Sequence, residues 1–493
     1  MKKVALIAFL FNCMLVCAQN RANVWELSYS DTLAFPNCEM KYVNGTMDTN
    51  LIYRVMSIYL TNSSICDTSG NLLFYSNGLT IGNKNYDTLQ NAVNFNPGWS
   101  TNSYEPGGMG INQGVLILPF PNFPYKYFIF SLSGELLQND IQPIHLSYSV
   151  IDMNLDGGLG GIVDTLKNKY AIDDTLCNGG LTAVKHANGR DWWVIVPEYY
   201  SNRFYKLLLT PNGIENLYYQ NIGLITTQDI IVQATFAPDG SKYCFSNAGG
   251  SFIYMKFDRC SGEFSNSTTI FSSDSLGFIG CSFSSNSRYL YVNTQYDLFQ
   301  YDTWNSNISD NVIHVATWDS FVHPVYHIPI LFGIQQLAPD GKIYVSGWNG
   351  TEYLNVINEP DSLGLGCNFG PHSYILPQYN NSVPTFPNYD LESLLSSACD
   401  TLFTLAPSKN VEANSFNISP NPSNGILNII YDTKENCKLN LYNVNGKLIA
   451  SISLFHYFKN RLLNVSDLAA GVYLATVTCK AERIWSAKVI VQR

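Results

Sequence analysis

FAPDGSKYCF, residues 236–245, combines a tight turn with the start of a strand. Asp239 and Gly240 are turn formers, because an Asp side chain bonds nearby backbone and Gly accepts a positive φ. The residues after the turn alternate aromatic and apolar side chains, which is the periodicity of a strand. The phrase therefore predicts two antiparallel strands joined by a short polar turn.

The same phrase recurs along the middle of the chain. Aligned on Asn188, Asp239, Asn286 and Asp340, successive copies lie 51, 47 and 54 residues apart. The other copies are VKHANGRDWWVIV at 184–196, FSSNSRYLYV at 283–292, LAPDGKIYV at 337–345 and DTSGNLLFY at 67–75. The 119 residues between Ser69 and Asn188 leave room for one more unit, around PNFPYKYFIFSL at 121–132.

A repeat of this length predicts the architecture of the body. A four-stranded antiparallel sheet cannot bury both of its faces alone, so the units must stack on one another. Arranged radially they form a β-propeller, and the period leaves room for about seven blades between residues 24 and 399. We expect residues 24–29 to complete the closing blade with a strand from the other end. The composition, 14% aromatic and 13% charged, also predicts an all-β fold.

The last stretch of the chain has a different character. SPNPSNG at 419–425, LYNVNGKLI at 441–449 and LAAGVYLATV at 468–477 mark turns between at least five short strands. This pattern predicts a small immunoglobulin-like β-sandwich over residues 415–493, after a linker at 401–414 and a propeller-like domain at 19–400. Residues 414–493 carry nine Lys or Arg and four Asp or Glu, whereas residues 19–413 have a net charge of −17. The opposite charges indicate two units with different partners.

These C-terminal motifs resemble the sorting domain of the type IX secretion system of Bacteroidota. The resemblance implies that the export machinery reads this domain, which is then usually cleaved off, and the alternative is an ordinary adhesive sandwich. Family members usually have Asp where this chain has Asn443. The residues that carry the resemblance, and hence the expected sorting signal, are Pro420, Asn421, Pro422, Gly425, Gly446, Lys447, Gly471, Tyr473 and Lys488.

The front of the chain predicts a signal peptide over residues 1–18. Lys2 and Lys3 precede an apolar segment that is too short to span a bilayer comfortably, and cleavage is expected between Ala18 and Gln19. A lipoprotein anchored at Cys17 is the alternative. No later stretch is long and apolar enough for a transmembrane helix. Together the two ends predict Sec export followed by type IX transport, to the medium or the outer-membrane surface of a Gram-negative cell.

The body itself resembles a propeller domain of exported Bacteroidota proteins. The resemblance rests on the phrases at 67–78, 184–196 and 337–345 and on LSYSVIDMNLDGGLGG at 146–161. That family is non-enzymatic or unassigned, so the resemblance implies a fold rather than an activity. Seven Asp-Ser/Thr-Leu triplets resemble the O-glycosylation acceptor of Bacteroidota, although such pairs also form ordinary turns. They start at Asp31, Asp87, Asp164, Asp174, Asp274, Asp361 and Asp400.

Ten cysteines remain after the signal peptide, and none forms a C-x-x-C pair. In an oxidising compartment an even number is compatible with disulfides. The pairings that we expect first are Cys260 with Cys281 and Cys367 with Cys399, although sequence does not determine connectivity.

The motifs of catalysis and metal binding are weak in this chain. Residues 152–157 match the first half of a calcium loop, but Val163 stands where the bidentate carboxylate is needed, so a turn is the better interpretation. His323 and His327 have the spacing of a helical metal pair, but Pro324 argues against a helix. No G-x-S-x-G elbow is present. We therefore predict no enzymatic activity, metal or cofactor, and the acidic body argues against nucleic acid as a partner.

A propeller presents loops from several blades around its channel, and aromatic side chains there can stack on sugars or contact a protein. The binding candidates are Trp99, Tyr104, Trp304, Trp318 and Trp348, each of which could instead pack between blades. We expect an exported binding protein whose ligand is a glycan or a surface protein. The alternative is a secreted hydrolase acting on glycans, with paired carboxylates at the mouth of the channel.

Overall fold

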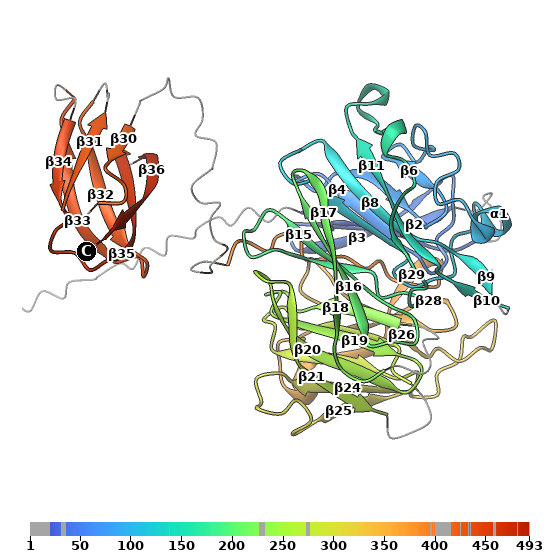
Figure 1. Ribbon diagram of the computed structural model, residues 1–493. Coiled ribbons are helices and arrows are strands. Elements are labelled where there is room, and N and C mark those ends of the chain that lie inside the picture. Colours follow the sequence, from blue (N-terminus) through green and yellow to red (C-terminus); the bar gives the residue numbers. More distant parts are fainter. Residues whose placement is uncertain are drawn as a thin grey trace, which may run out of the picture. The chain divides into compact units, whose positions relative to one another are not determined.

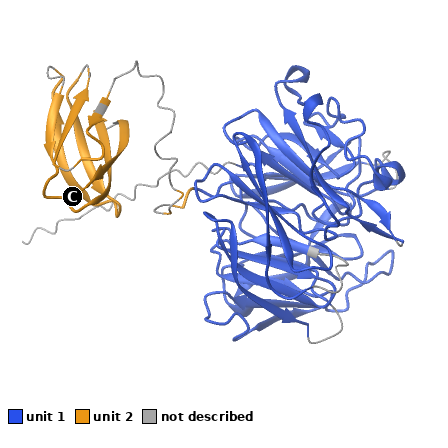
Figure 2. Ribbon diagram, viewed as in Figure 1, with its two compact units in different colours: residues 1–392 blue, residues 393–493 orange. Residues whose placement is uncertain are grey.

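The computed structural model describes residues 20–30, 36–137, 139–225, 232–272, 277–394, 397, 399, 416–423, 425–431, 433, 435–456, 460–480 and 482–492. The chain divides into two compact units, residues 1–392 and residues 393–493 (Figure 2). The predicted signal peptide, its expected cleavage between Ala18 and Gln19, and the predicted linker at 401–414 lie outside the described residues. Both units are built from β-strands, so the predicted all-β class is confirmed.

Unit 1 begins with three antiparallel sheets (Figure 1). The first contains β1 (Val24–Leu27), β2 (Asn37–Val43) and β3 (Thr46–Ile52). The second contains β4 (Ser63–Cys66), β5 (Leu72–Ser76) and β6 (Ile81–Asn83). The third contains β7 (Val115–Pro119), β8 (Lys126–Leu132) and β11 (His145–Asp152), with β12 (Gly161–Ile162) and β13 (Lys169–Asp173) both paired to β11.

Four four-stranded meanders follow in the described part of unit 1. The first contains β14 (Thr182–Lys185), β15 (Trp192–Pro197), β16 (Arg203–Thr210) and β17 (Gly213–Asn221), and the second contains β18 (Val232–Phe236), β19 (Lys242–Asn247), β20 (Ser251–Asp258) and β21 (Glu263–Phe271). The third contains β22 (Gly280–Phe283), β23 (Tyr289–Asn293), β24 (Asp297–Asp302) and β25 (Ile313–Thr317). The fourth contains β26 (Phe332–Leu337), β27 (Ile343–Gly347), β28 (Thr351–Ile357) and β29 (Phe369–Asn380).

Short elements decorate the sheets. A hairpin of β9 (Glu135–Leu137) and β10 (Asp140–Gln142) lies between β8 and β11 in the chain. The one α-helix of the described residues is α1 (Trp99–Tyr104). The 3₁₀ turns are η1 (Asp156–Gly158), η2 (Asp164–Leu166) and η3 (Gly364–Cys367).

Each copy of the repeated phrase forms the turn between the first and second strands of a sheet. Asp239 Oδ1 accepts a hydrogen bond from the Ser241 N–H at 2.9 Å, and Gly240 adopts a positive φ of 72°. The same side-chain turn occurs at Asn188, Asn286 and Asp340, where the N–H two residues on donates to the side-chain oxygen. The stretch at 121–132 spans the β7–β8 turn and β8, the equivalent place in its sheet. The repeat therefore comes from a turn that bonds to its own backbone.

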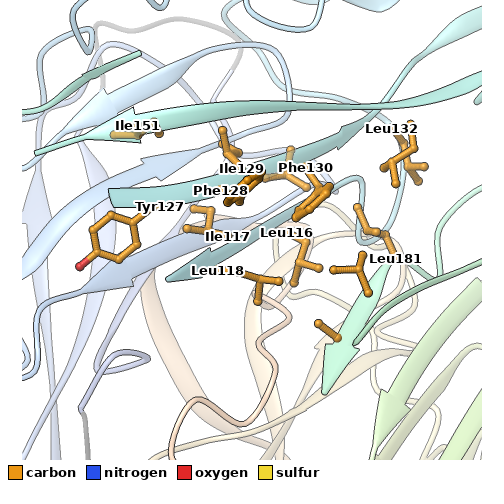
Figure 3. Close-up of a cluster of buried hydrophobic side chains, with 14 of the residues drawn as sticks. Leu116, Ile117, Leu118, Tyr127, Phe128, Ile129, Phe130, Leu132, Ile151 and Leu181 are labelled. Carbon is orange, nitrogen blue, oxygen red and sulfur yellow. The ribbon is translucent and has the colours of Figure 1, made fainter. Parts of the chain in front are cut away.

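The sheets of unit 1 pack face to face in chain order. The first strands of successive sheets contact one another, from β14 through β18 and β22 to β26 and from β1 through β4 to β7. Figure 3 shows Leu116, Phe128, Phe130 and Leu181 gathered in the cluster that joins the third and fourth sheets. Apolar faces that a single sheet could not bury are thus covered by its neighbours.

The first and last sheets of unit 1 also meet. Trp25 of β1 is fully buried, and its ring lies 5.6 Å from that of Tyr344 in β27. The Tyr29 N–H donates to the Tyr379 carbonyl at 3.0 Å, which connects the chain after β1 to β29. The two ends of the unit are therefore in contact, but the sheet of β1 contains β1, β2 and β3 and no strand from the other end, so the expected sharing of strands by residues 24–29 is not seen among the described residues.

An extended segment after β29, residues 381–392, ties several sheets together. The Phe386 N–H donates to Gln336 at 3.1 Å, and the Asn388 amide donates to the Pro238 carbonyl at 2.8 Å. The buried Tyr389 hydroxyl donates to the Ile117 carbonyl at 2.7 Å. These bonds reach the sheets of β26, β18 and β7, so this closing segment crosses the end of the unit.

Buried glutamines occupy the space between the first strands. Gln113 exchanges two hydrogen bonds with the backbone of Ala234 in β18. Gln233 accepts from the N–H groups of Cys281 and Gln335, both at 3.0 Å, so it bridges two further sheets. These amide side chains satisfy backbone groups of β18, β22 and β26 and connect neighbouring sheets.

The expected disulfides of unit 1 are wrong. Cys281 and Cys367 are free, buried thiols, whereas Cys260 and Cys399 are both disulfide-bonded. Cys281 lies in β22, a first strand at the centre of the unit, and Cys260 lies in the turn after β20. Cys260 and Cys281 are only 21 residues apart in sequence but do not form a disulfide, because one lies in a turn between strands and the other within a buried strand of the next sheet.

Unit 2 has two antiparallel sheets that enclose one core. One contains β30 (Phe416–Ser419), β31 (Ile426–Tyr431) and β34 (Asn460–Asn464). The other contains β33 (Leu448–Leu454), β32 (Cys437–Asn443), β35 (Gly471–Cys479) and β36 (Glu482–Val491). A disulfide joins Cys437 to Cys479 across the paired strands β32 and β35.

Candidate functional site

A large cavity lies where the first strands β4 and β7 begin. Its volume is about 800 Å³, within the range of pockets that hold organic ligands. Four tyrosines line it, together with one carboxylate, two amides and a glycine-rich loop. The lining residues are Tyr29, Tyr59, Ser103, Tyr104, Glu105, Pro106, Gly107, Gly108, Gly110, Ile141, Asn349, Tyr379 and Asn381. We call this the tyrosine cavity.

The tyrosines of this cavity present their rings at different angles. The rings of Tyr29 and Tyr59 lie 5.2 Å apart at 52°, so neither covers the face of the other. Tyr104 is 45% exposed, and Trp99 supports it edge-on at 5.2 Å. Tyr59 is 38% exposed. Aromatic faces held open to solvent in this way are available to an apolar ligand surface.

Polar groups stand between the rings. Glu105 is exposed at the rim, directly after Tyr104 in the chain. The Tyr379 hydroxyl donates to the Asn349 carbonyl at 2.9 Å, which fixes the ring against the β27–β28 turn. Of the described residues that line the cavity, Glu105 is the one carboxylate. The site thus offers hydroxyl and amide hydrogen bonding with little charge.

A buried ion pair holds Tyr29 and Tyr59 in place. Arg54 and Glu26 form it at 2.7 Å, and both side chains are fully buried. Arg54 also donates to the carbonyls of Met56 and Ser28, at 2.9 and 3.0 Å. It therefore fastens the backbone before Tyr59 to the backbone before Tyr29.

Burial sets the charge state of this pair. Burial raises the pKa of Glu26 to about 7, although the nearby Arg54 guanidinium acts to lower it. Glu39, which acts to raise it further, accepts a hydrogen bond from the Tyr86 hydroxyl at 2.7 Å. With this pKa the carboxyl of Glu26 is only partly ionised at pH 7, and without its arginine it would be ionised still less.

The loop between α1 and β7 is pinned against Tyr59. The Asn77 amide donates to the carbonyls of Ser57 and Pro106, at 2.9 and 3.0 Å. Gly108 has a φ of +117°, and a Cβ there would lie 2.8 Å from the Tyr59 nitrogen. Only glycine allows this approach, so the sequence G-G at 107–108 sets the rim of the cavity.

The structure brings two of the five predicted binding residues to this site. Tyr104 lines the cavity, and Trp99 packs behind it. Trp348 is half-buried against the cluster around Trp25, and Trp318 is half-buried beside Tyr296 at 5.7 Å. Trp304 is 66% exposed beneath the Arg288 guanidinium, 4.7 Å from its ring. The last three do not line the tyrosine cavity.

Sequence reasoning missed Tyr29, Tyr59 and Tyr379. They come from three distant stretches and carry no shared spacing, so only closure of the unit places them together. Alternation in the chain predicts which face of a strand is buried, but not which loops meet at the end of a sheet.

The weaker motifs prove to be structural. Asp152 accepts hydrogen bonds from the backbone and side-chain amides of Asn154, both at 2.9 Å, and forms the turn that we expected. His323 is buried with Nε2 2.8 Å from the Glu352 carboxylate, and its Nδ1 accepts the N–H groups of Val325 and Tyr326. No group of three metal-ligating side chains occurs among the described residues.

In unit 2 the predicted sorting residues shape the sandwich. The Asn421 amide donates to the Lys488 carbonyl at 2.7 Å, and its oxygen accepts the Ile490 N–H at 2.8 Å. The segment with Pro420 and Pro422 is therefore docked on β36. Asn443 accepts the Lys447 N–H at 2.9 Å in a turn where Gly446 has a φ of 71°. Asn serves there as an Asp would, because both offer the same oxygen.

The remaining sorting residues lie nearby in the same unit. The Gly425 carbonyl accepts the Val465 N–H at 2.7 Å. The buried Tyr473 hydroxyl donates to the Ala469 carbonyl at 2.8 Å, just before the exposed Gly471. Lys488 is exposed on β36.

Residues 417–492 match the family model described as the secretion system C-terminal sorting domain. Unit 2 contains a type IX sorting domain. The sorting domain directs the chain to export through the type IX secretion machinery, to the cell surface or the medium. Among the described residues, no helix has the length and apolar character needed to cross a membrane.

Solved structures similar to this chain share little sequence with it. A candidate 6-phosphogluconolactonase of Bacteroides uniformis is 12% identical, with 74% of this chain and 99% of that chain covered and a TM-score of 0.42. The periplasmic gluconolactonase PpgL of Pseudomonas aeruginosa is 10% identical, with 90% and 98% covered and a TM-score of 0.35. The extracellular domain of the candidate one-component system BT4673 of Bacteroides thetaiotaomicron is 12% identical, with 96% and 58% covered and a TM-score of 0.37. No curated sequence matches the chain. None of these likenesses transfers a function.

Proposed function

We propose that this protein is an exported, seven-bladed β-propeller that binds a glycan in the tyrosine cavity and is carried outward by its sorting domain. The propeller is supported by seven consecutive sheets in the described part of unit 1, each packed on the next. The closing blade combines β1–β3 with the buried segment around Val383. Residues 19–400 form the propeller domain and residues 415–493 the sorting domain in this proposal.

One observation carries the binding role: four tyrosines, two amides and a single carboxylate surround one cavity of about 800 Å³. Sugar rings have apolar C–H faces and a belt of hydroxyls. Tyr59 and Tyr104 offer exposed ring faces, while Asn349, Asn381 and Glu105 can take part in hydrogen bonding. A protein segment is the second kind of ligand that such a surface accepts, and the experiment below separates the two.

Binding is favoured over hydrolysis at this site because of its carboxylate. Retaining and inverting glycosidases both use a pair of carboxyl groups, about 5–9.5 Å apart. Glu105 has no second carboxylate beside it among the described residues that line the cavity. A hydrolase at this site would need another acid from elsewhere.

The test is a glycan array probed with the purified full chain, followed by calorimetric titration of any glycan that binds. We expect Tyr59→Ala and Tyr104→Ala each to weaken binding at least tenfold. Tyr125→Ala is the matched control, because this tyrosine is 60% exposed and lies in the β7–β8 turn, away from the cavity. Equal binding by all three variants would refute the site, and release of shorter sugars would favour the hydrolase.

The sorting role of unit 2 is tested in the native host. A chain that lacks residues 415–493 should stay inside the cell envelope, and Asn421→Ala should impair export because it frees the P-N-P segment from β36. Secretion of the shortened chain at the normal level would contradict the proposed role of these residues.

A further inference from the structure

A second cavity lies at the opposite end of β7 from the tyrosine cavity. It has a volume of about 260 Å³, below the ~300–1,000 Å³ of drug-sized ligand pockets, so it suits a single ring. Three cationic residues, three aromatic rings and three prolines line it. The lining residues are Arg21, Pro119, Phe120, Pro121, Asn122, Phe123, Pro124, Lys185, Arg190 and Trp192. We call this the cationic cavity.

The charge of this cavity contrasts with that of the unit around it. Residues 19–413 have a net charge of −17. Of the described residues that line the cationic cavity, none carries a carboxylate. Arg190 is paired with Asp191 through two hydrogen bonds of 2.6 and 2.8 Å, which fixes its guanidinium. Three positive groups thus converge on one hollow of an acidic molecule.

Lys185 is the unusual member of the set. It ends β14, only 8% of it is exposed, and its ammonium lies 5.4 Å from the centre of the Trp192 ring. Among the described residues, this contact with Trp192 is the one direct interaction of the ammonium itself, and the carboxylates of Asp390 and Glu392 act on it electrostatically. The ammonium therefore stays accessible on the open side of the cavity, where an anion that arrives from outside can meet it.

The electrostatics of Lys185 agree with this picture. Burial lowers the pKa of Lys185 to about 8; Asp390 and Glu392 act to raise it, whereas Arg21 and Arg259 lower it further. At neutral pH the side chain is therefore still protonated. A bound anion would stabilise that protonated form.

The walls of the cavity are rigid and apolar. Phe120 and Phe123 lie 4.7 Å apart, and the turn that carries them is closed by the Phe120 N–H to Lys126 carbonyl bond of 2.9 Å. Pro119, Pro121 and Pro124 restrict the same turn. Such walls suit the face of a ring better than a fully hydrated ion like phosphate, which needs more hydrogen-bond donors around it.

We propose that the cationic cavity binds a carboxylate carried on a sugar-sized ring, such as a uronic acid, with Lys185 and Arg21 facing the carboxylate and Phe120 and Trp192 beside the ring. This site is separate from the tyrosine cavity, so the proposal stands whether or not that cavity binds a glycan. The acid can be a free monosaccharide or the end of an oligosaccharide.

The experiment is calorimetric titration of the full chain with glucuronate, with glucose as the neutral probe and a glucuronate-ended disaccharide as the chain-end probe. We expect glucuronate to bind at least tenfold more tightly than glucose. Lys185→Met should abolish that preference, and Lys185→Arg should keep part of it. Lys84→Met is the control, since this exposed lysine lies outside the cavity.

The pH dependence provides a second readout that does not depend on a variant. Above pH 8 the affinity of the wild-type chain for glucuronate should fall about tenfold per pH unit, because the binding form carries a protonated lysine. Equal binding of glucuronate and glucose, or unchanged glucuronate binding by Lys185→Met, would overturn the proposal. If Lys185→Met fails to fold, the proposal is tested by the pH dependence of glucuronate binding to the wild-type chain and by the preference of Lys185→Arg for glucuronate over glucose. Comparison of the affinities for glucuronate and for the glucuronate-ended disaccharide shows whether the cavity prefers a free monosaccharide or the end of an oligosaccharide.

Discussion

Replacement of Arg54 by methionine should destabilise unit 1 in a pH-dependent way. The change removes the guanidinium that pairs with Glu26 at 2.7 Å and donates to the carbonyls of Met56 and Ser28. Breaking a buried ion pair from one side costs about 3–5 kcal/mol, because the remaining charge is left without compensation. At pH 7 we expect a loss at the lower end of that range, since Glu26 can take up a proton instead.

The pH dependence follows from the raised pKa of Glu26. In the wild-type chain this pKa is about 7 against 4.5 for an ordinary carboxyl, so the folded state holds its proton over that interval. Stability therefore falls by about 1.4 kcal/mol per pH unit from pH 4.5 to 7 and is level above it. Arg54 lowers the pKa of Glu26, so in the variant without Arg54 this pKa is higher and the free energy of unfolding continues to fall beyond pH 7. The difference in stability between variant and wild type should therefore grow as the pH rises above 7.

Urea unfolding at pH 7, 8 and 9, followed by the fluorescence of buried tryptophans, measures this difference. Glu26→Gln is the control: in the double variant with Arg54→Met, the growth above pH 7 should vanish, because the titrating group is gone. A difference that stays constant from pH 7 to 9 would refute the assignment of a buried carboxylate held ionised by Arg54. Ligand binding in the tyrosine cavity should also weaken in Arg54→Met, since Tyr29 and Tyr59 lose their common support.

Three further outcomes are expected. Lys185→Met should raise the free energy of unfolding by up to about 3 kcal/mol at pH 7, because the pKa of Lys185 in the folded state is about 8, well below the ordinary 10.5. The difference between variant and wild type should shrink as the pH rises above 8, because the wild-type lysine then loses its proton. A difference in urea unfolding that does not change with pH would contradict this explanation. Cys437→Ser should destabilise unit 2 by about 4 kcal/mol, from the 42-residue separation that the disulfide closes, as read from its calorimetric transition. Gly108→Ala should cost about 1–3 kcal/mol and displace Tyr59, with binding weakened in the same titration as Tyr59→Ala.

Local chemistry made much of the fold predictable. The turn at Asp239 bonds to its own backbone, and the same turn at Asn188, Asn286 and Asp340 gave the period of the sheets directly. The turn at Asn443 in the sorting domain was equally readable, because its side chain bonds to the Lys447 N–H four residues on. Signals of this kind depend on residues close in sequence, whereas Asn421 bonds to Lys488, 67 residues away.

The candidate sites depend on residues far apart, and sequence did not predict them. Tyr29 and Tyr379 meet only because the ends of unit 1 are joined, and Arg54 reaches Glu26 across 28 positions. Lys185 lies in a repeated phrase whose turn was recognised, yet nothing in the phrase shows that its side chain is buried against Trp192. The disulfides were wrong for the same reason: Cys281 is separated from Cys260 by depth in the unit, not by distance along the chain.

The closing segment at 381–392 has a consequence for assembly. Asn388 and Tyr389 bond to Pro238 and Ile117, which lie 150 and 272 residues earlier in the chain. A fragment that stops before residue 381 lacks these bonds to three sheets, so unit 1 is not fully fastened until nearly all of its residues are present. A protease that separates unit 1 from the sorting domain must therefore cut beyond this segment to leave these bonds intact.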